Sequence, residues 1–109
     1  MNRNKLIASF TANLTNAVLH KILEKAIDKS EIAEKYSKEI KNSWEITKEY
    51  RKKINPINAP LPDKQEVKEK IIKKVKAELR LRIKKGYENI DFNLVEGFVE
   101  QALKEMLVS

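Results

Sequence analysis

His20 is the only histidine in this chain of 109 residues, which makes it the first candidate for acid–base chemistry. On a helix that turns by about 100° per residue, Ser9, Asn13 and Asn16 fall on the same side as this imidazole. We expect these neutral side chains, and not a carboxylate, to be its hydrogen-bond partners, which argues against a general base. A small enzyme remains an alternative only if a carboxylate from another helix reaches His20.

Two pairs of acidic residues have a spacing that suits a shared site. Glu45 and Glu49 lie four residues apart, as do Glu96 and Glu100, so each pair projects from one side of a helix. A diiron bundle needs Glu-x-x-His motifs, which the sequence lacks, and one histidine without cysteines does not make a zinc site. The two glycines are isolated, so no glycine-rich phosphate loop is present. We therefore expect surface acids, no metal, no cofactor, no small-molecule substrate and no catalytic activity.

Positive charge is concentrated between residues 63 and 87. This segment holds ten lysines and arginines against four acids, so it carries +6 of the net charge of +7. On a helix, one side of the segment is apolar and the opposite side is basic. A basic side of this kind can bind a phosphate backbone by releasing counterions. The candidate nucleic-acid-binding residues are Lys70, Lys73, Lys76, Arg80 and Lys84.

Composition argues against sequence-specific recognition by this basic side, even if Arg51, Lys52 and Lys53 extend it. Lysine outnumbers arginine nineteen to four, whereas recognition of base edges favours the arginine fork. Tyr87 is the only aromatic residue available there to stack on a base. The segment 86–109 is acidic, and a helix formed from it would neutralise the basic side if it packed alongside. Non-sequence-specific binding of DNA or RNA is therefore the alternative function.

Helices must position all of these side chains, because the sequence contains no alternating strand pattern. The length suits one domain, residues 1–109, and 36% charged residues require long solvated helical faces. Asp63 and Asp91 have the character of N-terminal helix caps. The fold class predicted is all-α, a four-helix bundle-like single domain with a proline-containing crossover. Its predicted helices are 4–26, 31–54, 64–85 and 92–107, and its extended connector is 55–62, which holds Pro56, Pro60 and Pro62 and is packed down by Ile57 and Leu61.

The helix 4–26 is apolar around most of its circumference, so it must be buried on more than one side. Either the other three helices surround it in a monomer, or its second apolar side meets another copy of the chain. We expect the second arrangement, a homodimer, because small residues allow two helices to approach closely and a two-fold axis makes such contacts self-complementary. The predicted oligomer interface consists of Ala8, Ala12, Leu19 and Leu23.

The function expected from these patterns is that of a small basic helical interaction or scaffolding protein that assembles through its first helix. Its expected partner is itself, and nucleic acid is the alternative. We expect no membrane association, because polar residues interrupt the apolar part of the first helix and charges follow it closely. The absence of cysteine fits a reducing compartment, so the expected location is the cytoplasm.

Overall fold

Long stretches without proline form four helices in the computed structural model, which describes residues 2–27, 29–56 and 58–108. The helices are α1 (Arg3–Lys25), α2 (Ser30–Ile54), α3 (Lys64–Lys84) and α4 (Leu94–Val108). No strand occurs in these described ranges, so the all-α prediction is confirmed. None of the helices traced there has both the length and the apolar character needed to cross a membrane.

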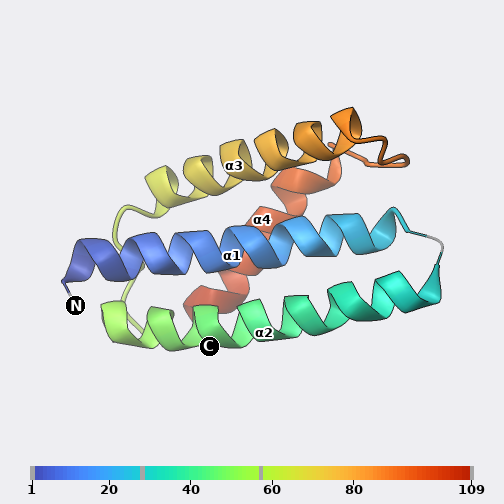
Figure 1. The fold of residues 1–109 in the computed structure, drawn as a ribbon. Coiled ribbons are helices and arrows are strands. Elements are labelled where there is room, and N and C mark those ends of the chain that lie inside the picture. Colours follow the sequence, from blue (N-terminus) through green and yellow to red (C-terminus); the bar gives the residue numbers. More distant parts are fainter. Residues whose placement is uncertain (1, 28, 57, 109) are drawn as a thin grey trace.

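Helix α1 is the central element of the fold. Figure 1 shows α1 between α2 and α3, with α4 crossing behind it, and α1 packs against all three of the other helices. Helices α1 and α3 run in the same direction, because α2 returns the chain before the connector leads into α3. The chain therefore adopts the central-helix arrangement that the sequence left as the alternative way to bury α1.

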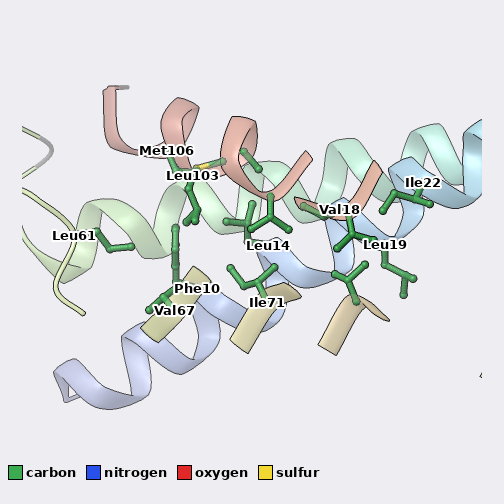
Figure 2. Packing of buried hydrophobic residues seen from close by; sticks show 14 of the residues in the cluster. Phe10, Leu14, Val18, Leu19, Ile22, Leu61, Val67, Ile71, Leu103 and Met106 are labelled. Atoms are coloured by element: carbon green, nitrogen blue, oxygen red, sulfur yellow. The ribbon is translucent and has the colours of Figure 1, made fainter. Parts of the chain in front are cut away.

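The hydrophobic core forms around α1, as Figure 2 shows. Phe10 and Leu14 of α1 are completely buried, and so is Ile71 of α3. Leu103 and Met106 of α4 close the core from behind, each with only 1% of its surface exposed. Ile54 of α2 belongs to the same apolar cluster, so residues from all four helices share it and hold the described helices in a single globule.

An aspartate precedes each of the last two helices: α3 begins at Lys64, as predicted, whereas α4 begins at Leu94, two residues after the predicted start. Asp63 occupies the N-cap position of α3, but its φ of 54° is left-handed and its side chain makes no capping hydrogen bond. Asp91 accepts a hydrogen bond from the backbone N–H of Asn93 at 2.9 Å, which forms a turn, and α4 begins only at Leu94. In both places the aspartate shapes the turn before the helix.

The connector between α2 and α3 is anchored to the globule and is not uniformly extended. Leu61 is buried with 3% exposure, and the backbone N–H of Ala59 donates to the carbonyl of Pro56 at 2.9 Å to form a turn. The predicted packing of Ile57 lies outside the described residues.

Candidate docking groove

A groove of about 700 Å³ runs between α1 and α3. Lys68 and Lys76, which pair with acids of α4, lie on the opposite side of α3 from Lys70 and Lys74 of the groove. The groove therefore opens on the face of the molecule that α4 does not cover. We call it the docking groove, and its lining residues are Asn4, Ile7, Ala8, Thr11, Ala12 and Thr15 from the α1 side and Asp63, Glu66, Val67, Lys70, Lys73, Lys74 and Ala77 from the α3 side.

The floor of the docking groove is effectively apolar. Ala8 and Ala12 are exposed there, and Val67 contributes a buried aliphatic side chain. The hydroxyl of Thr11 donates to the carbonyl of Ile7 at 2.8 Å, and that of Thr15 donates to the carbonyl of Thr11 at 2.7 Å. Because both hydroxyls are satisfied within α1, burying them under a partner leaves no donor without an acceptor.

The α3 side of the docking groove carries charges in a fixed order. Asp63 and Glu66 lie at its N-terminal end, and Lys73 and Lys74 lie two to three turns further along the helix. Lys70, between them, pairs with Glu66 of the same helix at 3.4 Å, and both side chains are well exposed. One end of the rim is therefore acidic and the other basic.

The predicted oligomer interface is divided by the fold. Ala8 and Ala12 are exposed in the docking groove. Leu19 and Leu23, in contrast, have only 4% and 1% of their surface exposed and belong to the core of the same chain. The reasoning that both leucines need a second copy to be buried is therefore corrected, because the chain covers them by itself. The predicted contact through Ala8 and Ala12 stays a prediction.

Acids of the same chain neutralise part of the basic side of α3. Lys76 pairs with Glu96 of α4 at 3.5 Å, and Arg80 lies over the ring of Phe92 at 6.0 Å from its centroid. Lys73 and Lys84 are exposed and form no ion pair within the described part of the chain. The five predicted nucleic-acid-binding residues thus lie on one helix, but they do not present five free charges.

Helix α4 is tied to α3 by a second ion pair. The ammonium of Lys68 donates to Oε1 of Glu100 at 2.6 Å. This hydrogen bond lowers the pKa of the Glu100 carboxyl from its ordinary value of 4.5. Together with the Lys76–Glu96 pair, it places the acidic side of α4 against one edge of the basic helix, as the charge balance of segment 86–109 suggested.

Arg51 does not extend the basic surface, contrary to the prediction from its neighbours Lys52 and Lys53. Only 1% of its surface is exposed. Its guanidinium donates to Oδ1 of Asn55 at 2.6 Å and to the carbonyl of Ala59 at 2.8 Å, while Nε has no hydrogen-bond partner among the described atoms. Burial lowers the pKa of Arg51 from its usual value. This side chain fastens the connector to α2.

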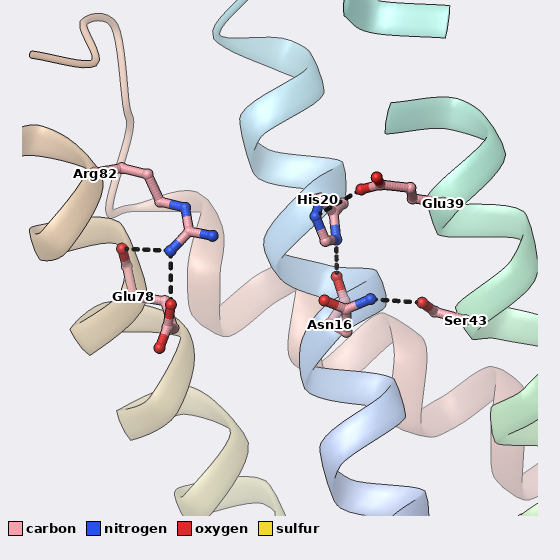
Figure 3. Close-up of polar contacts among 6 residues, drawn as sticks. All are labelled: Asn16, His20, Glu39, Ser43, Glu78 and Arg82. Atoms are coloured by element: carbon pink, nitrogen blue, oxygen red, sulfur yellow. Dashed lines mark hydrogen bonds and ion pairs between the residues drawn. The ribbon is translucent and has the colours of Figure 1, made fainter. Parts of the chain in front are cut away.

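His20 does meet a carboxylate from another helix, as Figure 3 shows. Its Nε2 lies 2.9 Å from Oε2 of Glu39 on α2, and its Nδ1 lies 2.8 Å from the carbonyl oxygen of Asn16. The amide of Asn16 donates to the hydroxyl of Ser43 at 2.7 Å. Because both ring nitrogens already have partners, neither can take a proton from Ser43 in this arrangement. The cluster therefore joins α1 to α2 without forming a nucleophile–base pair.

Tyr36 packs beside this cluster, with its ring centroid 5.4 Å from that of His20. Burial raises the pKa of the Tyr36 phenol above its usual 10.0, and a side-chain hydrogen bond with Tyr87 raises it further. Within the described ranges, no three histidine, aspartate or glutamate side chains lie close enough together to hold a metal ion.

No protein-family model, curated protein or solved structure matches the chain. Its function is therefore argued from its own residues.

Sequence reasoning found only part of the docking groove. The α1 side was expected to bind a partner through Ala8 and Ala12, but the α3 side was not included in that surface. Lys70 and Lys73 were considered only as nucleic-acid-binding residues, and Val67 and Lys74 were assigned to no site. The missing information was that α3 runs parallel to α1, which brings their two sequences side by side. No local sequence pattern predicts whether the connector, residues 55–62, leads into an α3 that is parallel or antiparallel to α1.

Proposed function

We propose that this protein is a small helical interaction module, and that the docking groove is the surface through which it assembles with a partner. The observation that carries this proposal is the groove's floor, where Ala8 and Ala12 remain exposed beside a buried Val67 and two satisfied threonine hydroxyls. An apolar groove of this form suits an amphipathic helix, which places its apolar side in the groove and its polar side toward solvent.

The dimensions of the docking groove support a helical ligand. Its α3 side extends from Asp63 to Ala77, which at about 1.5 Å per residue corresponds to roughly 21 Å. A helix of about 14 residues has that length. The polar cluster around His20 offers no comparable opening, since His20 is mostly covered and Ser43 is buried. A binding role is therefore better supported than a catalytic one.

A peptide titration followed by NMR tests the proposal. The probe is a synthetic amphipathic helix of about 14 residues with a Leu/Ala face and an uncharged Gln face, so that charge does not decide the outcome. We expect saturable shifts of the amides of Ala8, Ala12 and Ala77, and Ala12→Glu should abolish them. Ser37→Glu introduces the same charge at an exposed position of α2 and is the matched control. Shifts scattered over other helices, or no saturation at millimolar peptide, would disprove a docking role.

Nucleic-acid binding is the second candidate, and the exposure of Lys73, Lys74 and Lys84 favours it. If these three lysines contact phosphates, the affinity for duplex DNA should fall roughly forty-fold between 50 and 200 mM salt, because each contact releases about 0.9 counterions. Fluorescence anisotropy at the two salt concentrations measures this fall. A salt-independent signal, or no binding at 50 mM salt, removes this candidate.

A further inference from the structure

The charge order along the docking groove restricts what can occupy it. Asp63 and Glu66 would repel one end of a uniformly acidic helix, and Lys73 and Lys74 would repel the other end of a uniformly basic one. A partner that carries the opposite order, basic where this rim is acidic, satisfies both ends. The chain itself supplies this order when a second copy is turned end for end.

A two-fold axis across the groove is suggested by the middle of each lining. Lys70 lies midway between Glu66 and Lys74 along α3, and the midpoint of the α1 lining falls between Ala8 and Ala12. Because α1 and α3 run in the same direction, a two-fold axis laid across the groove, perpendicular to both helices and close to these midpoints, turns a second copy end for end. That axis reverses α1 and α3 together.

We propose that the occupant of the docking groove is a second copy of this chain, bound groove to groove with α1 and α3 each antiparallel to their counterparts. This inference rests on the proposed role of the groove as a docking surface. Ala8 of one copy then faces Ala12 of the other, and their small side chains let the two α1 helices approach closely. Asp63 and Glu66 of each copy face Lys73 and Lys74 of the other.

The remaining groups in the groove are compatible with this pairing. The exposed Ala8 and Ala12 and the half-buried Ile7 of both copies supply the apolar part of a four-helix contact made by α1, α3 and their counterparts. Lys70 lies next to its own counterpart on the axis, and its ion pair with Glu66 at 3.4 Å reduces the repulsion between them. Thirteen lining residues per copy fall below the roughly 20–30 of a standard interface, so we expect a micromolar dimer.

Charge reversal with mixing is the decisive experiment. The variant Lys73→Glu/Lys74→Glu makes the whole rim acidic, and the variant Asp63→Lys/Glu66→Lys makes it basic. In sedimentation velocity at concentrations up to several hundred micromolar, the unmodified chain of 12.7 kDa should form a species of twice that mass. Each variant alone should remain monomeric, and an equimolar mixture of the two should recover the dimer. Lys41→Glu/Lys48→Glu, an equal charge change on exposed residues of α2, should leave dimerisation intact.

A disulfide experiment reports the register without relying on charge. The chain contains no cysteine, so Ala8→Cys and Ala12→Cys each introduce a single thiol. Antiparallel pairing predicts that a mixture of the two variants oxidises to the mixed dimer faster than either variant oxidises alone. Equal oxidation rates for the mixture and for each cysteine variant alone would rule out this register. This test still applies if circular dichroism shows that the charge variants fail to fold.

Failure of this inference can be told apart from failure of the proposed function. An unmodified chain that stays monomeric at several hundred micromolar, yet binds the uncharged peptide in the groove, has a docking surface for another protein and not for itself. A chain that neither dimerises nor binds the peptide loses both proposals. If each charge variant alone is monomeric and their equimolar mixture forms the dimer, the second copy is established as the occupant of the docking groove.

Discussion

Replacement of Arg51 by alanine tests how the connector is held against α2. The guanidinium is 1% exposed and makes hydrogen bonds of 2.6 and 2.8 Å to Asn55 and Ala59. Each hydrogen bond from a charged donor contributes about 1.5–3 kcal/mol. The substitution also removes the desolvation cost of a buried charge that has no acidic partner among the described residues. This gain offsets part of the free energy lost with the two hydrogen bonds. With the cavity left behind, we expect Arg51→Ala to lower the free energy of unfolding by about 3 kcal/mol.

Arg51→Met separates the charge from the packing. Methionine keeps most of the apolar stem and removes both the charge and the two hydrogen bonds, so we expect a smaller loss, about 1 kcal/mol. Urea unfolding followed by circular dichroism measures both variants. At a slope of about 1–2 kcal/mol per molar urea, the alanine variant should lower the midpoint by roughly 2 M.

A double-mutant cycle identifies where the energy resides. Asn55→Ala alone removes one acceptor of the guanidinium, so its effect should shrink once Arg51 is already methionine. Proteolysis should also cut within residues 55–62 faster in Arg51→Ala than in the unmodified chain. A midpoint for Arg51→Ala within 0.3 M of the unmodified chain, together with unchanged cleavage, would refute the view that this side chain fastens the connector.

Three further predictions concern the core and the two titrating contacts. Phe10→Ala empties a fully buried site on the central helix and should reduce the free energy of unfolding by about 3–5 kcal/mol, measured by urea unfolding. Because Lys68 lowers the pKa of Glu100, this pair should stabilise the fold above pH 4.5 and lose its contribution as pH falls through the folded-state pKa; Glu100→Gln should flatten that part of an acid-unfolding profile. The raised pKa of Tyr36 stabilises the fold below pH 10 and ceases to do so as pH rises through the folded-state value, and Tyr87→Phe should bring its phenolate absorbance titration back toward 10.0.

The helices could be predicted from the sequence because their signals are local. Helix-length runs without proline, and apolar residues at a helical period, are properties of neighbouring residues. The same reasoning placed the start of α3 correctly after Asp63, but Asp63 makes no side-chain capping hydrogen bond, and Asp91 lies three residues before the start of α4. A cap depends on the backbone angles that the preceding turn imposes, and Asp63 adopts a left-handed conformation, with a φ of 54°.

The sequence predicted that α1 is buried on more than one side, but it did not predict which segments bury it. Leu19 and Leu23 are apolar, and their residue type does not distinguish burial by the same chain from burial by a second copy. Arg51 shows a different error: it lies four residues after Thr47 and three before Ile54 on the buried side of α2, but its charge led us to group it with the exposed Lys52 and Lys53. Glu39, the partner of His20, lies nineteen residues away on another helix, which only the packing of α1 against α2 reveals.

The central position of α1 also bears on how the chain folds during synthesis. Its contacts with α2 form between sequence neighbours, while those with α4 join segments about 70 residues or more apart. A ribosome adding roughly 5–20 residues per second therefore completes α1, the central helix, several seconds before it synthesises α4, the last helix that packs on it. In a nascent chain that ends before Leu94, α4 is absent and cannot cover Leu14 and Val18. Such fragments should therefore aggregate and be degraded quickly.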